Sequence, residues 1–142
     1  MSKLPGINGK VFDCDPRLKR LHEYVAQNYS ESIPLGKAAR IAALGKSYFS
    51  SYFRAKVGIT FTDWLRQIRV SKAAELMKTS DFSISEVAEA VGFKDLKTFE
   101  RAFKRYALKT PREFKKLVLP GLTERLLQTR KVPALSSRKG GR

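Results

Sequence analysis

The chain has 142 residues, 42% of them hydrophobic, and its 29 Lys and Arg against 13 Asp and Glu give a formal net charge of +16. This apolar content suits one or two small packed units and excludes a disordered basic arm. A single Cys excludes a disulfide framework and a Cys-rich zinc site. No apolar run of about 18 residues exists, and the first residues lack the apolar core of a signal peptide. We therefore expect a cytoplasmic protein, without metal or cofactor, whose partner is an anionic polymer or surface.

The first part of the chain predicts an arm followed by a helix. Residues 1–14 contain one Pro and two Gly without periodicity, which indicates a flexible arm or the remnant of a linker. Asp15 is then the expected N-cap of a helix that runs to about Tyr29, with Pro16 at its first position. His22 has no Cys, His or acidic cluster at ligand spacing, so we expect it at the rim of the core.

One pattern occurs twice, in residues 35–58 and in residues 83–116. Each copy predicts a short helix with small apolar residues on one face, a tight turn, and a longer helix with two inward Phe. The longer helices align at an offset of 50 residues and the shorter ones at 49, so the first turn is one residue shorter. The chain is therefore predicted to contain two copies of one helix-turn-helix unit.

Capping signals mark the helices of the second copy. Ser83 and Glu86 have the spacing of a capping box, and Gly92 ends the short helix that they begin. Asp95 is the expected N-cap of the longer helix. Thr110, followed by Pro, begins a third helix.

Residues 61–80 predict a helix between the two copies, capped by Thr60 with Asp63. We expect Trp64 in the core rather than as a platform for stacked bases. About 19 residues at 1.5 Å each make a rod of roughly 28 Å. Successive major grooves on one side of B-DNA are about 34 Å apart. This helix and the units at its ends thus suit two helices placed one DNA turn apart.

Residues 16–118 resemble the DNA-binding module of the AraC/XylS family of bacterial transcription regulators. The matching residues of the second copy are Ile84, Val87, Ala88, Gly92, Phe93, Asp95, Phe99, Arg101, Phe103, Lys104, Thr110 and Pro111. The chain departs from the family at Gly45, where a Ser N-cap is usual, at Leu108, where Gly is usual, and at Lys115, where Arg is frequent. Because Leu accepts positive φ less readily than Gly, we expect the turn after Tyr106 to be rebuilt.

This resemblance implies an all-α, homeodomain-like fold of two helix-turn-helix subdomains joined by a long linker helix. It also implies a sequence-specific DNA-binding regulator that places two recognition helices in successive major grooves. The expected base-reading residues are Ser47, Ser50, Ser51, Lys97, Thr98 and Arg101. The expected phosphate contacts are Lys46, Arg54, Lys104, Arg105 and Lys109. The expected partner is double-stranded DNA, bound by this chain as a monomer, with RNA polymerase as a further candidate.

Simpler interpretations of these residues stay open at this point. The serines are compatible with a merely soluble surface, and Arg101 with an internal ion pair to Glu100 or Asp95. A DNA-acting enzyme would need a reactive group. Cys14 is the one thiol, but the negative charges of Asp13 and Asp15 beside it disfavour the reactive thiolate, so no enzyme activity is expected. A helical adaptor for an acidic protein is the third alternative, because charge alone does not exclude it.

The end of the chain predicts a basic tail. Residues 120–142 carry six Lys or Arg and one Glu among Gly, Pro and Ser. They are compatible with a disordered end and with an arm that touches phosphates. No effector-binding domain is expected in the chain. The expected segments are an arm (1–14), a first helix-turn-helix subdomain (15–60), the linker helix (61–80), a second subdomain (81–119) and the tail (120–142).

Overall fold

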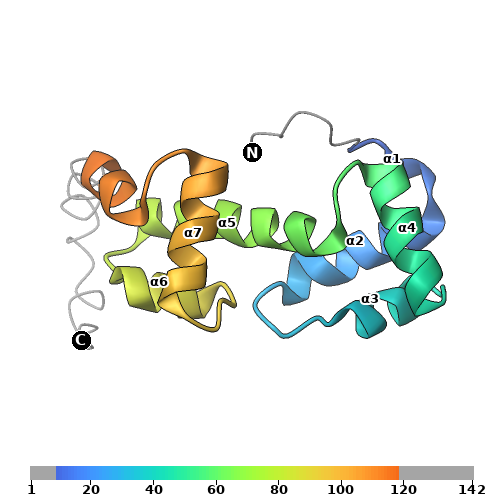
Figure 1. Ribbon diagram of the computed structural model, residues 1–142. Coiled ribbons are helices and arrows are strands. Elements are labelled where there is room, and N and C mark those ends of the chain that lie inside the picture. The colour runs from blue at the N-terminus through green and yellow to red at the C-terminus, as the bar shows by residue number, and fades with distance from the viewer. Residues whose placement is uncertain (1–8, 119–142) are drawn as a thin grey trace, which may run out of the picture.

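The computed structural model describes residues 9–118, and every regular element within this range is a helix. Figure 1 shows two groups of short helices at the two ends of one long helix, α5. The helices are α1 (Val11–Cys14), α2 (Pro16–Asn28), α3 (Leu35–Ile41), α4 (Lys46–Val57), α5 (Phe61–Thr79), α6 (Ile84–Ala90) and α7 (Leu96–Ala107). Residues 111–118 are also helical. The all-α prediction with two helix-turn-helix subdomains is confirmed.

Both ends of the chain fall outside the described range. Residues 1–8 and 119–142 lie there, and with them most of the predicted arm and the basic tail. Within residues 9–118, no helix combines the length and the apolar character that a membrane crossing requires.

The prediction of a flexible arm is wrong for its last residues, because α1 packs on the first subdomain. Phe12 is buried, and its ring stacks on Trp64 with 5.1 Å between the ring centroids. The exposed His22 ring lies 5.0 Å from Phe12, so its expected place at the rim of the core is confirmed. Partners this far along the chain leave no local periodicity, which explains why the sequence did not predict α1.

The first subdomain begins at the predicted cap. The Asp15 carboxylate accepts hydrogen bonds from the amides of Arg17 and Leu18 at 3.0 and 3.4 Å. The core beneath it combines the apolar stripe of α2 with the two inward Phe of α4 and the first residues of α5. Its fully buried large side chains are Leu18, Leu21, Val25, Phe49, Phe53 and Val57.

The second subdomain also follows its capping signals. The Ser83 side chain accepts from the Glu86 amide at 3.1 Å, while Glu86 accepts from the Ser83 amide at 2.7 Å. Asp95 caps α7 by accepting from the amide of Thr98 at 2.7 Å. Thr110 and Glu113 form the same reciprocal pair before the helical residues 111–118. The core here includes Val87, Val91, Phe99 and Phe103, all fully buried.

Helix α5 contributes buried side chains to both cores and does not only separate the two subdomains. It has 19 residues and the predicted cap, in which the Thr60 hydroxyl accepts from the Asp63 amide at 3.1 Å. Its first turns bury Phe61, Trp64 and Leu65 in the core of the first subdomain. Later turns bury Val70, Ala73 and Met77 in the core of the second. Trp64 therefore belongs to the core, as expected.

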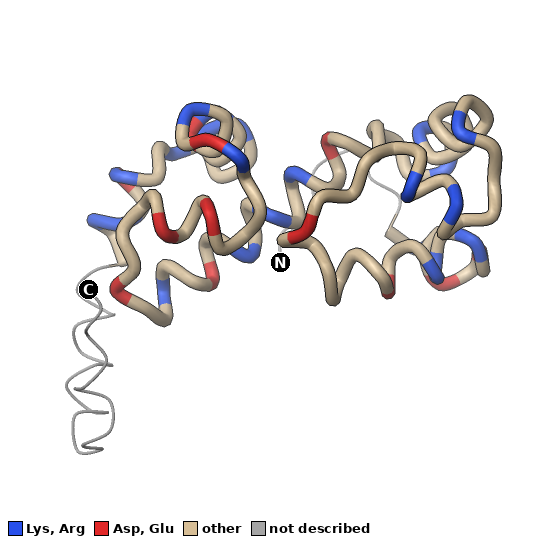
Figure 2. The backbone as a smooth tube through the Cα atoms, turned by 90° about the horizontal axis from the view of Figure 1, so that it is seen from below, with Lys and Arg blue, Asp and Glu red and all other residues tan. Residues whose placement is uncertain are grey.

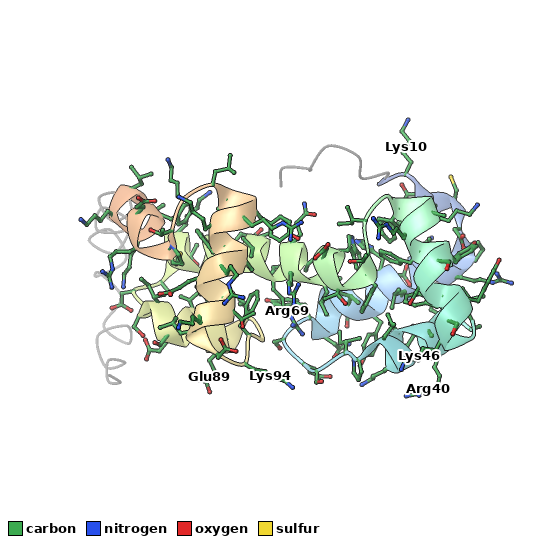
Figure 3. The ribbon with its side chains drawn as sticks, viewed as in Figure 1. Lys10, Arg40, Lys46, Arg69, Glu89 and Lys94 are labelled. Carbon is green, nitrogen blue, oxygen red and sulfur yellow. The ribbon has the colours of Figure 1, made fainter. Side chains whose placement is uncertain are left out.

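The middle of α5 also joins the two subdomains through Arg69 (Figure 3). Its guanidinium donates to the backbone carbonyls of Tyr29 and Glu31, each at 2.7 Å. Burial, with a smaller effect from Arg66, lowers the pKa of Arg69 from its usual value. A Cβ on Gly92, at the turn of the second subdomain, would lie only 2.9 Å from Ser30 Cα and 3.0 Å from Arg69 Nε. We call these two Arg69 hydrogen bonds, together with the close packing of Gly92 against Ser30 and Arg69, the Arg69 clamp.

Each helix-turn-helix unit has two residues with a left-handed backbone, one in the turn and one at the end of the second helix. At each of these two places, one unit has Gly and the other has a different residue. Ala43 (φ 59°) and Gly92 (φ 104°) occupy the turns between the two helices. Gly58 (φ 106°) and Leu108 (φ 65°) end the second helices. The expectation that Leu108 would force a rebuilt turn is wrong. Leu108 takes the left-handed conformation itself, with its side chain 78% exposed and free of steric conflict with a core.

Candidate nucleic-acid interface

The second helix of each unit presents the predicted interface. In Figure 1, α4 and α7 both begin near the lower edge of the molecule and rise across opposite ends of α5. Each buries one Phe-bearing stripe in its own core, so the opposite stripe remains exposed to solvent. Because α4 and α7 are both exposed, run in the same direction and are held by the one helix α5, they can contact one side of a long polymer.

The exposed stripe of α4 is short and polar. Ser47 and Ser51 are exposed one turn apart, and Arg54 follows on the next turn. Ser50 is only half-buried and borders this stripe. Gly45 is the N-cap and makes no side-chain hydrogen bond, so the first amides of α4 are not bonded by their cap residue. Short hydroxyl side chains allow a helix to approach base edges closely.

The corresponding stripe of α7 is strongly cationic. Lys97, Arg101 and Lys104 are all exposed at the same helical spacing. Among the described residues, Arg101 makes no ion pair within 4.0 Å, so the alternative pair with Asp95 does not form. Its guanidinium is therefore available for a bidentate contact.

Thr98 has a part of its hydrogen-bonding capacity already committed. Its hydroxyl donates to the Asp95 carboxylate at 3.0 Å, in addition to the bond from its amide. The bonds from the Thr98 amide and hydroxyl lower the pKa of Asp95 below its usual value of 3.8. The methyl group and an oxygen lone pair of Thr98 are what remains for a base.

The predicted phosphate contacts surround these stripes. Lys46 is the first residue of α4, and Figure 3 places it at the lower edge of the molecule near Arg40 of α3. Lys104 and Lys109 are exposed on and just after α7. Arg105 is exposed as well, but it lies over the ring of Tyr106 and reaches toward Asp63 of α5. The structure thus turns Arg105 toward α5.

The two units differ in the charge of their first helices. Helix α3 carries Lys37 and Arg40 and no acidic residue, whereas α6 carries Glu86 and Glu89 and no basic one. The first unit therefore adds cations beside a stripe in which Arg54 is the one charged residue, and the second unit has its cations on α7 itself. Figure 2 shows the resulting spread of Lys and Arg over both units.

Tyr48 was missed as a candidate reading residue. It is 58% exposed on the first turn of α4, and its ring lies 5.6 Å from that of Tyr52. The Tyr52 hydroxyl in turn donates to the Asp15 carboxylate. Although burial opposes it, the bonds from Tyr52 and from the Leu18 and Arg17 amides lower the pKa of Asp15. The repeat offset of 50 that aligns Tyr48 with Thr98 was the signal available in the sequence.

The chain is similar in sequence to known regulatory proteins. A family model described as a helix-turn-helix domain matches residues 38–117. The Msm operon regulatory protein of Streptococcus mutans is 27% identical over 99 residues, and the raffinose operon regulatory protein RafR of Pediococcus pentosaceus is 30% identical over 95. These alignments cover 70% and 67% of this chain but 36% and 34% of the relatives. The chain thus spans about a third of the length of these regulators.

Solved structures give the same result. The DNA-binding domain of AdpA, solved in complex with a target DNA, superposes with a TM-score of 0.67 at 26% identity and covers 72% of this chain and 92% of that one. The C-terminal domain of the response regulator yesN of Fusobacterium nucleatum has a TM-score of 0.63 at 31% identity, with coverages of 68% and 95%.

The fold and these matches together define a DNA-binding domain with two helix-turn-helix motifs. The family match over residues 38–117 then places the chain more narrowly. It belongs to the AraC-type helix-turn-helix family of bacterial transcription regulators.

Proposed function

We propose that the chain binds one asymmetric duplex site as a monomer, with α4 and α7 in two successive major grooves on one face of the DNA. The observation that carries this proposal is the pair of equally spaced exposed stripes at the two ends of α5. Ser47, Ser51 and Arg54 on α4 repeat as Lys97, Arg101 and Lys104 on α7. A helix of 19 residues spans about 28 Å, close to the groove repeat of about 34 Å.

In this proposal the two stripes read bases by different chemistry. Arg101 has the fork geometry to donate to O6 and N7 of one guanine, the commonest specific contact in the major groove. Ser47, Ser50, Ser51 and Thr98 offer hydroxyls that are compatible with several bases. Lys97 completes the reading set. The flanking cations Lys46, Arg54, Lys104, Arg105 and Lys109 release counterions from phosphates and supply affinity without sequence choice.

The proposal extends to the setting in which the chain acts. The site would be bacterial DNA in the cytoplasm, and RNA polymerase is the protein partner implied for a regulator bound near a promoter. No catalytic step is part of the proposal.

The experiment selects bound sequences from random duplexes and then compares Arg101→Ala with Lys104→Ala. We expect Arg101→Ala to cost about 1–3 kcal/mol on the selected site and to relax the preference at one or two base pairs. Lys104→Ala should weaken selected and random duplexes alike and reduce the salt slope by about 0.9. Equal losses on both kinds of duplex for Arg101→Ala would remove it from the base-reading set. A palindromic site bound only by two copies would contradict the monomer.

A further inference from the structure

Three arginines converge on a pocket between α5 and α7. The pocket has a volume of about 110 Å³. Its lining residues are Arg66, Thr98, Arg101, Ala102, Arg105 and Tyr106. One of these arginines comes from α5 and two come from α7, so the pocket exists only because the two helices pack together. Like-charged guanidinium groups that line one pocket repel each other, and negative charge nearby offsets this repulsion.

That compensation is incomplete among the described residues. Nη1 of Arg66 lies 3.6 Å and Nη1 of Arg105 lies 4.0 Å from the same carboxylate oxygen of Asp63. Both separations exceed a hydrogen bond, so one carboxylate is shared loosely by two arginines. Tyr106 adds no charge, because burial and, to a smaller extent, Asp63 raise the pKa of its hydroxyl. Arg101 has no carboxylate partner there.

The pocket adjoins the reading stripe of α7. Thr98, Arg101 and Arg105 follow each other at three- and four-residue spacing, so they form a stripe beside Lys97, Arg101 and Lys104. Arg101 belongs to both stripes. Thr98, Arg101 and Arg105 lie on the side of α7 that faces α5. From there, α5 extends to the other unit. With α7 in a major groove, this side meets the DNA backbone that borders the groove toward the other unit.

We propose that this pocket holds one DNA phosphate between the two half-sites, with Arg66 and Arg105 as its ligands and Asp63 as the counter-ion that the phosphate displaces. The inference rests on the proposed DNA binding. Two guanidinium forks match the oxygens of a phosphate, which they hold by short charge-assisted bonds that the Asp63 carboxylate does not make here. Arg66 is then a DNA ligand contributed by the linker helix, and Asp63 keeps both arginines in place while lowering the affinity for DNA.

The test replaces single phosphates of the selected duplex by uncharged methylphosphonates. For the unchanged chain, we expect one position between the half-sites at which neutralisation weakens binding about tenfold. Arg66→Gln and Arg105→Gln should each weaken binding to the ordinary duplex and be clearly less sensitive than the unchanged chain to neutralisation at that position. Arg112→Gln, at an exposed arginine outside the pocket, should keep the full sensitivity. Asp63→Asn should bind selected and random duplexes more tightly by about the same factor.

The outcomes separate this inference from the function on which it rests. Equal methylphosphonate penalties for the unchanged chain and both arginine variants, with specific binding intact, would overturn the phosphate site alone. Absence of any specific binding would overturn both proposals. A further arm measures thermal melting in inorganic phosphate. Stabilisation that is lost in Arg66→Gln, without a sensitive position on the duplex, would identify a site for a free anion and also overturn the assignment to DNA. Melting curves of both arginine variants confirm that they are folded.

Discussion

Replacing Gly92 by Ala should break the Arg69 clamp. The added Cβ would lie 2.9 Å from Ser30 Cα and 3.0 Å from the Ser30 carbonyl oxygen, and neither backbone atom can rotate away. It would also lie 3.0 Å from Arg69 Nε, which is fixed by its own bond to the Tyr29 carbonyl. Relief of this contact requires the two subdomains to move apart at this point.

Three effects set the magnitude. A Cβ at the left-handed φ of 104° costs about 1–2 kcal/mol. Loss of one hydrogen bond from the charged Arg69 costs about 1.5–3 kcal/mol. The lower entropy of the unfolded chain offsets about 0.4–1 kcal/mol of this. We expect Gly92→Ala to lower the free energy of unfolding by about 2–4 kcal/mol, measured by urea denaturation with circular dichroism as the readout.

The chain offers its own control at the equivalent turn of the first unit. Ala43 is an exposed non-Gly residue at φ 59°, so Ala43→Gly tests the backbone effect without the contact. Removal of the Cβ relieves the strain of the left-handed conformation, whereas Gly increases the conformational entropy of the unfolded chain. The relief is the larger effect, so Ala43→Gly should raise the free energy of unfolding by about 0.5–1 kcal/mol. If Gly92→Ala lowers the free energy of unfolding by no more than Ala43→Gly raises it, the clamp is refuted, because backbone strain alone would then account for both changes.

Three other variants test separate features. Leu108→Gly should raise the free energy of unfolding by about 0.5–1 kcal/mol in the same assay, because a left-handed residue that is 78% exposed loses strain and no packing. A lower free energy of unfolding would mean that the Leu108 side chain makes stabilising contacts. Asp95→Asn should lower Tm near neutral pH, and the difference from the unchanged chain should narrow as pH falls below about 3.8. The pKa of Asp95 is lowered on folding, so its stabilising effect is present above that pH and is lost in acid. A difference independent of pH would contradict this. We expect Tyr48→Ala to weaken the selected duplex by about 1 kcal/mol, with little effect on random duplexes, through loss of a contact between the exposed ring and a base. Equal losses on both kinds of duplex would contradict a base contact. Tyr48→Phe is the matched control for the hydroxyl.

Local signals predicted most of the helices. The caps Asp15, Thr60, Ser83 and Asp95 each begin a helix at the expected residue, because a cap acts within three or four residues of itself. The repeat of Phe positions predicted both second helices for the same reason. These features need no knowledge of how the units pack.

The features that sequence reasoning missed depend on contacts between distant segments. Phe12 is ordered by Trp64, and Arg69 by the carbonyls of Tyr29 and Glu31. In the candidate interface, the exposure of Ser47, Ser51, Lys97 and Arg101 was predictable from helix periodicity. The turning of Arg105 toward Asp63 was not, because it depends on the rotation of α7 about its axis relative to α5.

The double role of α5 sets how this chain can change its target. Each residue added to the middle of a helix advances the remaining turns by 1.5 Å and rotates them by about 100°. One insertion in α5 would therefore swing α7 away from the face that α4 shares, and would shift Val70, Ala73 and Met77 out of the second core. In the proposed binding mode, substitutions on α4 and α7 alter which bases are preferred. The spacing between the two half-sites, in contrast, is fixed by the length of α5, because both cores depend on the side chains of this helix.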